Sequence, residues 1–305
     1  MEFHIFGQQL VNGLALGSIY GLIAVGYTMV YGIIGMINFA HGDVYMVSAY
    51  ITAICIAILS FFGISSAAFL IIITLVVTMF IVSLYGWSIE RIAYKPLRNS
   101  PRLAPLISAI GVSLVLQNYV QVSQGAKTQA VPTILPGVFR FGTETDFFQI
   151  TYIQALLVIV SFASMALLTY IIQKTSLGRQ CRAVQQDPKM AAILGINTDR
   201  IISTVFILGA AMAAIAGVLV TLNYGSFDFS VGFITGVKAF TAAVLGGIGS
   251  LPGAMLGGII LGMSESLFSG FINTDYKDVF AFSLLVLVLI FRPSGLLGKP
   301  LVEKV

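Results

Sequence analysis

Long apolar runs separated by short polar stretches make up most of the chain. A helix that crosses a bilayer needs about 20 predominantly apolar residues, so each run of that length predicts one span. Runs of this kind lie at residues 10–31, 44–62, 67–87, 103–122, 151–172 and 201–222. The pattern therefore predicts an integral membrane protein built from transmembrane helices.

The region after these runs is harder to divide into helices. The apolar stretch 231–271 is about twice as long as one span requires, and a last apolar run follows at 279–291. The middle of the stretch contains residues that disfavour a helix interior, namely Gly246, Gly247, Gly249, Ser250 and Pro252. We therefore expect eight or nine spans, with broken or re-entrant helices as an alternative in this stretch.

The amino-acid composition agrees with a membrane protein. Hydrophobic residues make up 58% of the chain and charged residues only 9%, whereas soluble domains carry about 25% charged residues. A soluble fold must keep its exterior wet and has no place for so much apolar surface. A lipid bilayer removes this conflict, because the exterior of the protein is then apolar as well.

The positive charges of the chain lie in a few short segments. Most Lys and Arg residues fall in the loops 90–102 and 174–200 and in the tail from residue 292, while the polar stretch 124–149 has only Lys127 and Arg140. Cytoplasmic loops of membrane proteins carry an excess of Lys and Arg. We therefore place the two loops and the C-terminus in the cytoplasm and the stretch 124–149 outside. This topology accounts for the net charge of +4 without nucleic acid as a partner.

Several kinds of chemistry are not predicted. Cys55 lies in an apolar run and Cys181 in a basic loop, so no disulfide is expected. His4 and His41 are the two histidines of the chain and form no cluster with ligand spacing, so no metal site is expected. The phosphate-binding motif G-x-x-x-x-G-K-[ST] is missing from the sequence, so this chain is not expected to hydrolyse nucleotide.

The basic loop 174–200 contains the pattern of a short helix. Asp187 followed by Pro188 is typical of a helix start, and Gly195 is typical of a helix end. The apolar residues between them that share one face are Met190, Ile193 and Leu194. A helix this short is not stable alone in water, so this face packs either against its own membrane domain or into a partner protein.

Polar residues also interrupt the first apolar third of the chain. Asn38, His41 and Asp43 stand in a stretch that is otherwise uncharged from Phe3 to Glu90. They form either a solvated turn at the cytoplasmic membrane surface or a broken helix that lines a transport path. Two general observations support the second alternative. Ionised side chains at membrane depth face cavities or partners, and irregular backbone at that depth needs polar groups that satisfy its hydrogen bonds.

Two charged residues flank the glycine-rich break in the stretch 231–271. Lys238 and Glu265 each lie within an apolar run, where an unpaired charge is unfavourable. They either pair with each other or line a path and contact a charged solute.

Glycines repeat at a spacing of four residues in two of the apolar runs. Gly13, Gly17 and Gly21 lie on one face of the first predicted helix. The second set comprises the pairs Gly253/Gly257 and Gly258/Gly262. Small residues at this spacing let two transmembrane helices approach closely, so we interpret both sets as helix-packing faces.

Three motifs spread over the chain resemble one known family. They are Asn-Phe-Ala-His-Gly-Asp at 38–43, the glycine-rich segment at 238–249 that continues through 252–258, and Arg-Pro-Ser-Gly-Leu-Leu-Gly at 292–298. Together they resemble the permeases of branched-chain amino acid ABC importers of the LivH type over nearly the whole length. The loop 174–200, with Ala191–Ala192 followed by Gly195, is similar to the coupling loop of ABC importer permeases.

The resemblance implies a fold and a set of partners. It implies an all-α, polytopic transmembrane helical bundle of the type II-like ABC importer permease kind, with residues 1–305 as a single domain. Such a permease lies in the bacterial inner membrane and pairs with a second homologous permease subunit. It also works with two cytoplasmic ATP-binding subunits, which hold ATP and Mg²⁺, and with an external substrate-binding protein. Leucine, isoleucine and valine are the implied substrates, and the chain itself is not an enzyme and binds no cofactor.

The resemblance also implies roles for individual residues. The residues expected to contact the ATPase subunits are Arg179, Arg182, Asp187, Pro188, Met190, Ala191, Ala192, Leu194 and Gly195. The candidates for the translocation path are Asn38, His41, Asp43, Lys238, Gly246, Gly247, Gly249 and Glu265. Arg179 and Arg182 point either to acidic groups of the ATPase or to solvent and lipid headgroups.

An ion-coupled secondary transporter of small polar solutes is the alternative function. That mechanism needs carboxylates in the membrane that titrate during the transport cycle. The sequence offers Glu265 within an apolar run and Asp43 near a membrane surface. This sparse supply favours the ATP-driven importer.

Overall fold

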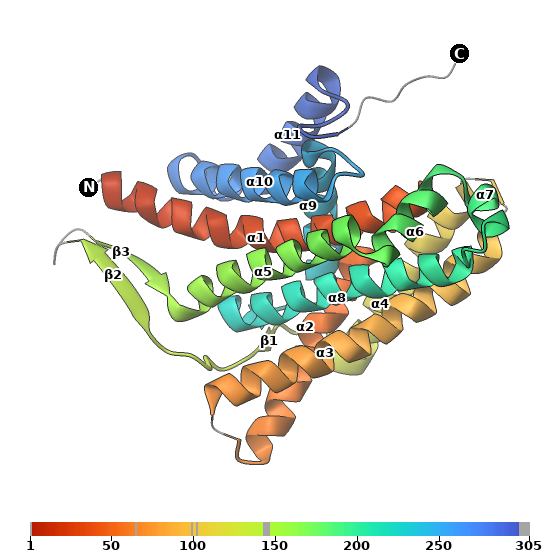
Figure 1. The fold of residues 1–305 in the computed structure, drawn as a ribbon. Coiled ribbons are helices and arrows are strands. Elements are labelled where there is room, and N and C mark those ends of the chain that lie inside the picture. Colours follow the sequence, from red (N-terminus) through yellow and green to blue (C-terminus); the bar gives the residue numbers. More distant parts are fainter. Residues whose placement is uncertain (1, 65, 99, 102, 143–146, 299–305) are drawn as a thin grey trace.

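The computed structural model describes residues 2–64, 66–98, 100–101, 103–142 and 147–298. Most of the long helices run side by side along one direction (Figure 1). The N-terminus and a β-hairpin lie at one end of this bundle, and two short helices lie at the other end. The arrangement is that of a polytopic helical bundle, as the apolar runs predict.

The helices are those expected from the apolar runs, with several short additions. The first half contains α1 (Glu2–Ile34), α2 (His41–Phe61), α3 (Ala67–Ile89) and α4 (Leu103–Gln124). The second half contains α5 (Tyr152–Lys174), α6 (Ser176–Gln186), α7 (Pro188–Ile193), α8 (Thr198–Tyr224), α9 (Val231–Gly246), α10 (Leu251–Phe271) and α11 (Lys277–Phe291). Helix α3 continues as a π-helical turn (Glu90–Tyr94) and a 3₁₀ turn (Lys95–Leu97).

Seven of the described helices are long and apolar enough to cross a membrane, namely α1, α2, α3, α4, α5, α8 and α10. Helices α9 and α11 contain 16 and 15 residues, which is about 24 and 22 Å at 1.5 Å per residue. They are therefore shorter than the hydrocarbon core, which is about 30 Å thick. The stretch 231–271 does hold two helices, α9 and α10, so the expected eight or nine spans correspond to seven long helices and two short ones.

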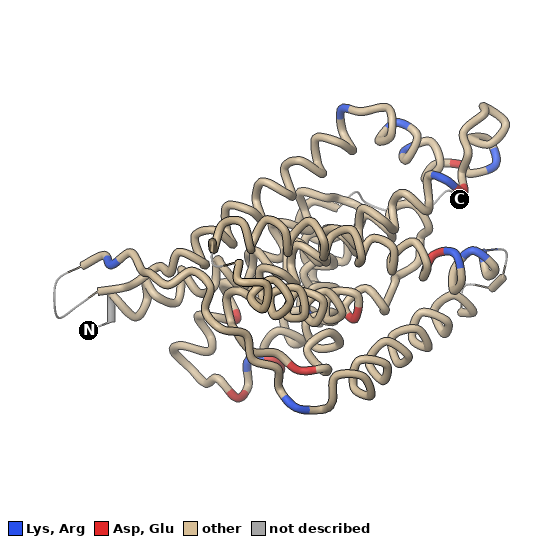
Figure 2. Tube along the Cα trace, turned by 90° about the horizontal axis from the view of Figure 1, so that it is seen from below, with Lys and Arg blue, Asp and Glu red and all other residues tan. Residues whose placement is uncertain are grey.

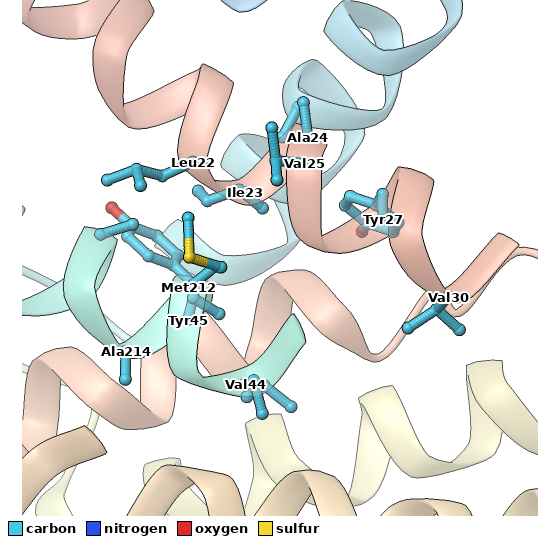
Figure 3. Packing of buried hydrophobic residues seen from close by; sticks show 14 of the residues in the cluster. Leu22, Ile23, Ala24, Val25, Tyr27, Val30, Val44, Tyr45, Met212 and Ala214 are labelled. Carbon is cyan, nitrogen blue, oxygen red and sulfur yellow. The ribbon is translucent and has the colours of Figure 1, made fainter. Parts of the chain in front are cut away.

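Helices α1 and α8 form the centre of the bundle. In their most apolar windows 89% and 83% of the residues are buried, compared with 22% in α3 and in α5. Figure 3 shows side chains of α1, α2 and α8 meeting in this core. Those labelled include Leu22, Ile23, Tyr45, Met212 and Ala214. Apolar residues on α3 and α5 instead remain exposed on the outside of the bundle, as expected of surfaces that face lipid.

The repeated glycines bring α1 and α10 into close contact. A Cβ on Gly17 would lie 2.7 Å from the Cα of Ile259, and one on Gly13 would lie 2.8 Å from the Cα of Met263. No side chain fits in such a gap, so the two backbones touch. This confirms the helix-packing interpretation of both glycine sets.

The polar stretch and the N-terminus lie at one end of the bundle. Strand β2 (Val138–Gly142) pairs antiparallel with β3 (Phe147–Thr151), and β1 (Gln129–Ala130) pairs with β4 (Ser226–Phe227) after α8. The side chain of Gln8 accepts from the backbone N–H of Gln149 at 2.9 Å. These contacts hold the hairpin against the start of α1.

The two basic loops meet at the opposite end. Arg98 and Lys95, which follow α3, both form ion pairs with Asp199 at the start of α8. Many of the Lys and Arg residues gather at this end of the helices (Figure 2). The separation of basic and polar segments expected from the charge pattern is therefore present in the fold.

Candidate functional site

The short helix predicted in the loop 174–200 is α7. Asp187 is its N-cap, and the carboxylate oxygen Oδ1 accepts from the N–H groups of Lys189 at 2.9 Å and Met190 at 3.0 Å. Pro188 occupies the first turn. Gly195 has a φ of +83°, a conformation that favours glycine after a helix end. The sequence signals for the start and the end of this helix are thus confirmed.

The apolar face of α7 is not covered by the rest of the chain. The exposed fractions of Met190, Ile193 and Leu194 are 53%, 77% and 73%. Packing of this face against its own membrane domain, one of the two alternatives, is therefore wrong. Ala191 is only 1% exposed, so its expected contact with a partner is also wrong, because this side chain instead packs inward. Ala192 is exposed.

Helix α6 attaches α7 to the bundle, and the sequence pattern did not reveal it as a separate element. The buried residues of α6 are Gly178, Cys181 and Val184. Burial raises the pKa of the Cys181 thiol, and both Cys55 and Cys181 carry free thiols, as expected. The guanidinium of Arg182 donates to the carbonyl of Ile172 at 2.7 Å. This arginine therefore caps the end of α5, and the side chains of Arg179 and Arg182 are both exposed.

The polar turn between α1 and α2 is buried. Asn38, His41 and Asp43 are 4%, 2% and 0% exposed, so the alternative of a solvated surface turn is wrong. The ring of His41 lies against Gly26, where an added Cβ would come within 2.7 Å of Cε1. Gly26 precedes the end of α1 by about two turns. The chain thus folds back into the protein after Ile34, and α2 begins inside the bundle.

Hydrogen bonds occupy part of this buried turn. The side-chain oxygen of Asn38 accepts from the N–H of Ala40 at 3.1 Å and from the hydroxyl of Tyr94 at 3.0 Å. Ser113 on α4 donates to the carboxylate of Asp43. His41 Nε2 and Asp43 Oδ1 have no hydrogen-bond partner among the described residues. The turn is therefore a polar site within an apolar bundle.

Lys238 and Glu265 pair with each other. Lys238 Nζ lies 2.6 Å from Glu265 Oε1 and 2.5 Å from Asp278 Oδ1. The hydroxyl of Tyr20 donates to the other oxygen of Glu265 at 3.0 Å. Lys238 and Glu265 are 4% and 3% exposed, whereas Asp278 is 42% exposed. We call these four residues the Lys238 cluster; its members on α1 and α11 were not found from the sequence.

The Lys238 cluster lines a cavity of about 830 Å³. The cavity lies between α1, α8, α9, α10 and α11, toward the end where α1 begins and α8 and α10 end. Its lining combines the ionised groups with aliphatic side chains such as Leu16, Ile19 and Val220. A cavity of this size and mixed character can hold a small amphiphilic solute.

The other path candidates lie elsewhere. The turn 38–43 packs against the first half of α9, since a Cβ on Gly236 would lie 2.9 Å from the Cα of Gly42. The glycine-rich break contacts the C-terminal tail, and Leu297 N–H donates to the carbonyl of Gly246 at 2.9 Å. A Cβ on Gly247 would overlap Gly298 of the same tail. Gly246 and Gly247 thus serve close backbone packing, and the structure does not bring the eight candidates into one site.

A second ion-paired cluster was not expected. Glu90, at the edge of the first basic loop, is only 1% exposed. It pairs with Arg98, which also pairs with Asp199, and Ser203 donates to Glu90 at 2.7 Å. We call Glu90, Arg98, Asp199 and Ser203 the Arg98 cluster. The sequence did contain a signal, because Glu90 is an acidic residue in a loop with four cationic residues. That pattern does not distinguish a buried carboxylate from a solvated one.

Comparison with known proteins identifies the family. The family described as "Branched-chain amino acid transport system / permease component" matches residues 9–289. The chain is 54% identical over 305 residues to the high-affinity branched-chain amino acid transport system permease protein LivH of Salmonella typhimurium, covering 100% of this chain and 99% of that protein. It is 53% identical over the same length to BraD of Pseudomonas aeruginosa, a permease of the same description, with the same coverage.

The comparisons also find more distant similarities. The permease LivM of Escherichia coli is 27% identical over 308 aligned residues, which cover 94% of this chain and 69% of LivM. Among solved structures, PsaBC from Streptococcus pneumoniae aligns with a TM-score of 0.46 and 15% identity, covering 96% of this chain and 94% of that one. The full-length identity above one half and the family match together decide against an ion-coupled secondary transporter. This multi-pass membrane protein belongs to the permease family of branched-chain amino acid ABC importers, whose members are transport subunits and not enzymes.

Proposed function

We propose that this chain is one of two membrane-spanning subunits of an importer for leucine, isoleucine and valine. The relatives with about half of their residues identical are described as high-affinity branched-chain amino acid permeases. Similarity to both a LivH and a LivM protein supports pairing with a second, homologous permease. Energy comes from ATP and Mg²⁺ on two separate cytoplasmic subunits, and an external binding protein delivers the substrate.

The proposed orientation follows from the charges. The end that carries α6, α7 and the ion pairs of Lys95 and Arg98 faces the cytoplasm of a bacterial inner membrane, in line with the excess of positive charge. The hairpin and the start of α1 face outward. An odd number of crossings, seven long and two short, then leaves the tail after α11 on the cytoplasmic side. Residues 1–305 form one permease domain in this arrangement.

The exposed apolar face of α7 is the observation that carries the proposal. A helix of six residues is not stable by itself, yet its N-cap and the buried Ala191 hold it in place. Exposed Met190, Ile193 and Leu194 remain available for a groove in an ATPase subunit, a common mode of helix recognition. Ile193 thus joins the coupling residues, while Ala191 acts by anchoring α7.

The transport cycle then converts ATPase motion into a change of access. ATP binding draws the two ATPases together, and each ATPase moves the α7 seated in its groove. The motion passes to α6 and the end of α5 on one side and to the start of α8 on the other. The bundle opens first to the loaded binding protein and later to the cytoplasm.

The cavity at the Lys238 cluster is the proposed outer part of the path. Its aliphatic lining suits a branched side chain, and its ionised groups suit an ammonium and a carboxylate. Lys238 and Glu265 already satisfy each other, so contacts with the substrate are weak. Weak contacts are suitable for a path, because tight binding would slow release.

Cross-linking tests whether α7 binds in a groove of an ATPase subunit. In a background without native cysteines, Met190→Cys, Ile193→Cys and Leu194→Cys are expected to cross-link to the ATPase subunits in membranes. Leu114→Cys on α4 is the matched control, because Leu114 and Met190 have the same exposed fraction of 53%. Absence of cross-links at all three positions would remove α7 as the coupling element.

A further inference from the structure

The last turns of α3 contain an unusual piece of helix. Residues Glu90–Tyr94 form a π-helical turn at the end of a long apolar helix. Turns of this kind are rare and occur frequently at functional sites. Side chains from this single turn reach in two directions, toward the coupling loop and toward the buried start of α2.

The first direction leads to the start of α8. Arg98 pairs with both Glu90 and Asp199, and Ser203 donates to Glu90. Lys95 adds a second ion pair to Asp199 at 2.8 Å. Asp199 lies in the first turn of α8, two residues after the N-cap Asn197, and belongs to the last residues of the loop 174–200. A displacement of that loop therefore acts on the π turn through ionic contacts.

The second direction leads into the bundle. Tyr94 is 1% exposed, and its hydroxyl donates to the side-chain oxygen of Asn38 at 3.0 Å. The same oxygen accepts from the N–H of Ala40, the N-cap residue of α2. The ring of Tyr94 packs on Phe206 of α8 with 5.1 Å between ring centroids. Tyr94 thus contacts both the helix that follows the coupling loop and the turn where α2 begins.

Close packing makes this region stiff on the side of α8. A Cβ on Gly86 would lie 2.9 Å from the carbonyl oxygen of Phe206, so α3 and α8 touch through their backbones just before the π turn. The start of α2 is closely packed as well, because a Cβ on Gly42 would lie 2.7 Å from the Cα of Gly236, although His41 Nε2 and Asp43 Oδ1 have no hydrogen-bond partner among the described residues. Two side-chain hydrogen bonds also hold it, because Asn38 accepts from Tyr94 and Asp43 accepts from Ser113. The bond from Tyr94 is the one that connects the start of α2 to the π turn.

We propose that residues 90–98 form a second transmission element, which carries the motion of the coupling loop to the buried start of α2. The proposal rests on the importer function proposed above. The π turn has a nearby alternative in the ordinary α-helical register, and a shift by one residue turns a side chain by about 100°. Such a shift moves Tyr94 relative to Asn38. Tyr94 and Arg98 are accordingly positioning residues, which act on the path through α2.

Removal of one hydroxyl tests the contact between the π turn and the start of α2. Tyr94→Phe is expected to lower substrate transported per ATP hydrolysed by about fivefold, the equivalent of one neutral hydrogen bond. ATP hydrolysis itself and thermal stability of the purified complex should stay within about twofold and a few degrees of wild type. Tyr170→Phe, which removes a hydroxyl from an exposed position on α5, is the matched control and should leave the ratio unchanged.

Neutralising Asp199 tests the contact between the coupling loop and residues 90–98. Asp199→Asn is expected to lower the same ratio, whereas Asp275→Asn at the opposite end of the bundle is not. If both act along one route, Tyr94→Phe combined with Asp199→Asn should reduce the ratio by less than the product of the two single effects.

Two results would overturn the proposal. One is an unchanged ratio of transport to ATP hydrolysis in Tyr94→Phe, and the other is fully multiplicative effects in the double variant. If Met190→Cys still cross-links to the ATPase, either result leaves the proposed binding of α7 to the ATPase unaffected. Failure of that cross-link is the separate signature of a wrong proposed function.

Discussion

The Arg98 cluster and the Lys238 cluster have nearly the same composition at opposite ends of the bundle. In each, one cation joins a buried carboxylate to a half-exposed one, and a hydroxyl donates to the buried carboxylate. Glu90 and Glu265 are 1% and 3% exposed, while Asp199 and Asp278 are 51% and 42% exposed. The two sites differ in their surroundings and in the cation, which is arginine in one and lysine in the other.

The surroundings suggest different tasks for the two clusters. The Lys238 cluster lines a cavity of about 830 Å³, so its charges can meet a solute. The Arg98 cluster lies between the end of α3 and the start of α8. Arg98 binds its two carboxylates through two different nitrogens of a rigid plane, whereas Lys238 contacts both of its carboxylates through the single Nζ. Similar ion pairs thus line the transport path in the Lys238 cluster and connect α3 to α8 in the Arg98 cluster.

Loss of Lys238 is expected to have the largest effect. Lys238→Met leaves Glu265 buried without its cation, which should reduce the stability of the complex by about 3–5 kcal/mol. Replacing Glu265 as well, in Lys238→Met with Glu265→Met, should recover most of that loss. Thermal unfolding in detergent measures both. Additive losses in the double variant would show that the two side chains do not depend on each other.

Loss of Arg98 is expected to be smaller. Arg98→Gln should reduce stability by about 1.5–3 kcal/mol, because Arg98 is more exposed than Lys238, at 17% against 4%. Glutamine, unlike methionine, also keeps an N–H group that can donate to the buried carboxylate. Arg98→Lys should restore stability in part but not the ratio of transport to ATP hydrolysis, since lysine has one nitrogen on a flexible stem and cannot hold the two carboxylates at the separation that the rigid guanidinium fixes. Full recovery of that ratio by lysine would remove the distinction between the two clusters.

The half-exposed aspartates are expected to have the smallest effect on stability and to separate the two tasks. Asp199→Asn and Asp278→Asn should each change stability by less than about 1 kcal/mol, as is usual for exposed ion pairs. Asp278→Asn should change the KM of uptake at an unchanged ratio of transport to ATP hydrolysis. Asp199→Asn should change that ratio at an unchanged KM. The same phenotype from both variants would contradict separate tasks.

The sequence predicts the helices of this fold well, because the bilayer itself demands long apolar segments. The ends of α2 and α3 lie within a few residues of the expected places, and the cap residues of α7 are correct. Glycine spacing also predicts where two helices touch, as the contact of Gly17 with Ile259 confirms.

The sequence does not predict which polar residues at helix ends are buried. Asn38 and Glu90 look alike in the pattern, since each stands where an apolar run meets polar residues. Their burial depends on the return of the chain into the bundle after Ile34 and on the approach of α8 to the end of α3. The Lys238 cluster was found only in part for the same reason, because Tyr20 and Asp278 come from distant helices.

The exposed face of α7 allows the most direct test of the central claim, namely that this permease receives its energy through α7. The measurement is ATP-dependent leucine uptake into proteoliposomes that contain this chain, its homologous permease and the ATPases, with the binding protein added. Replacing Met190, Ile193 and Leu194 together by serine is predicted to abolish uptake while both permeases remain inserted and paired. Uptake at the wild-type rate in this triple variant would contradict the account.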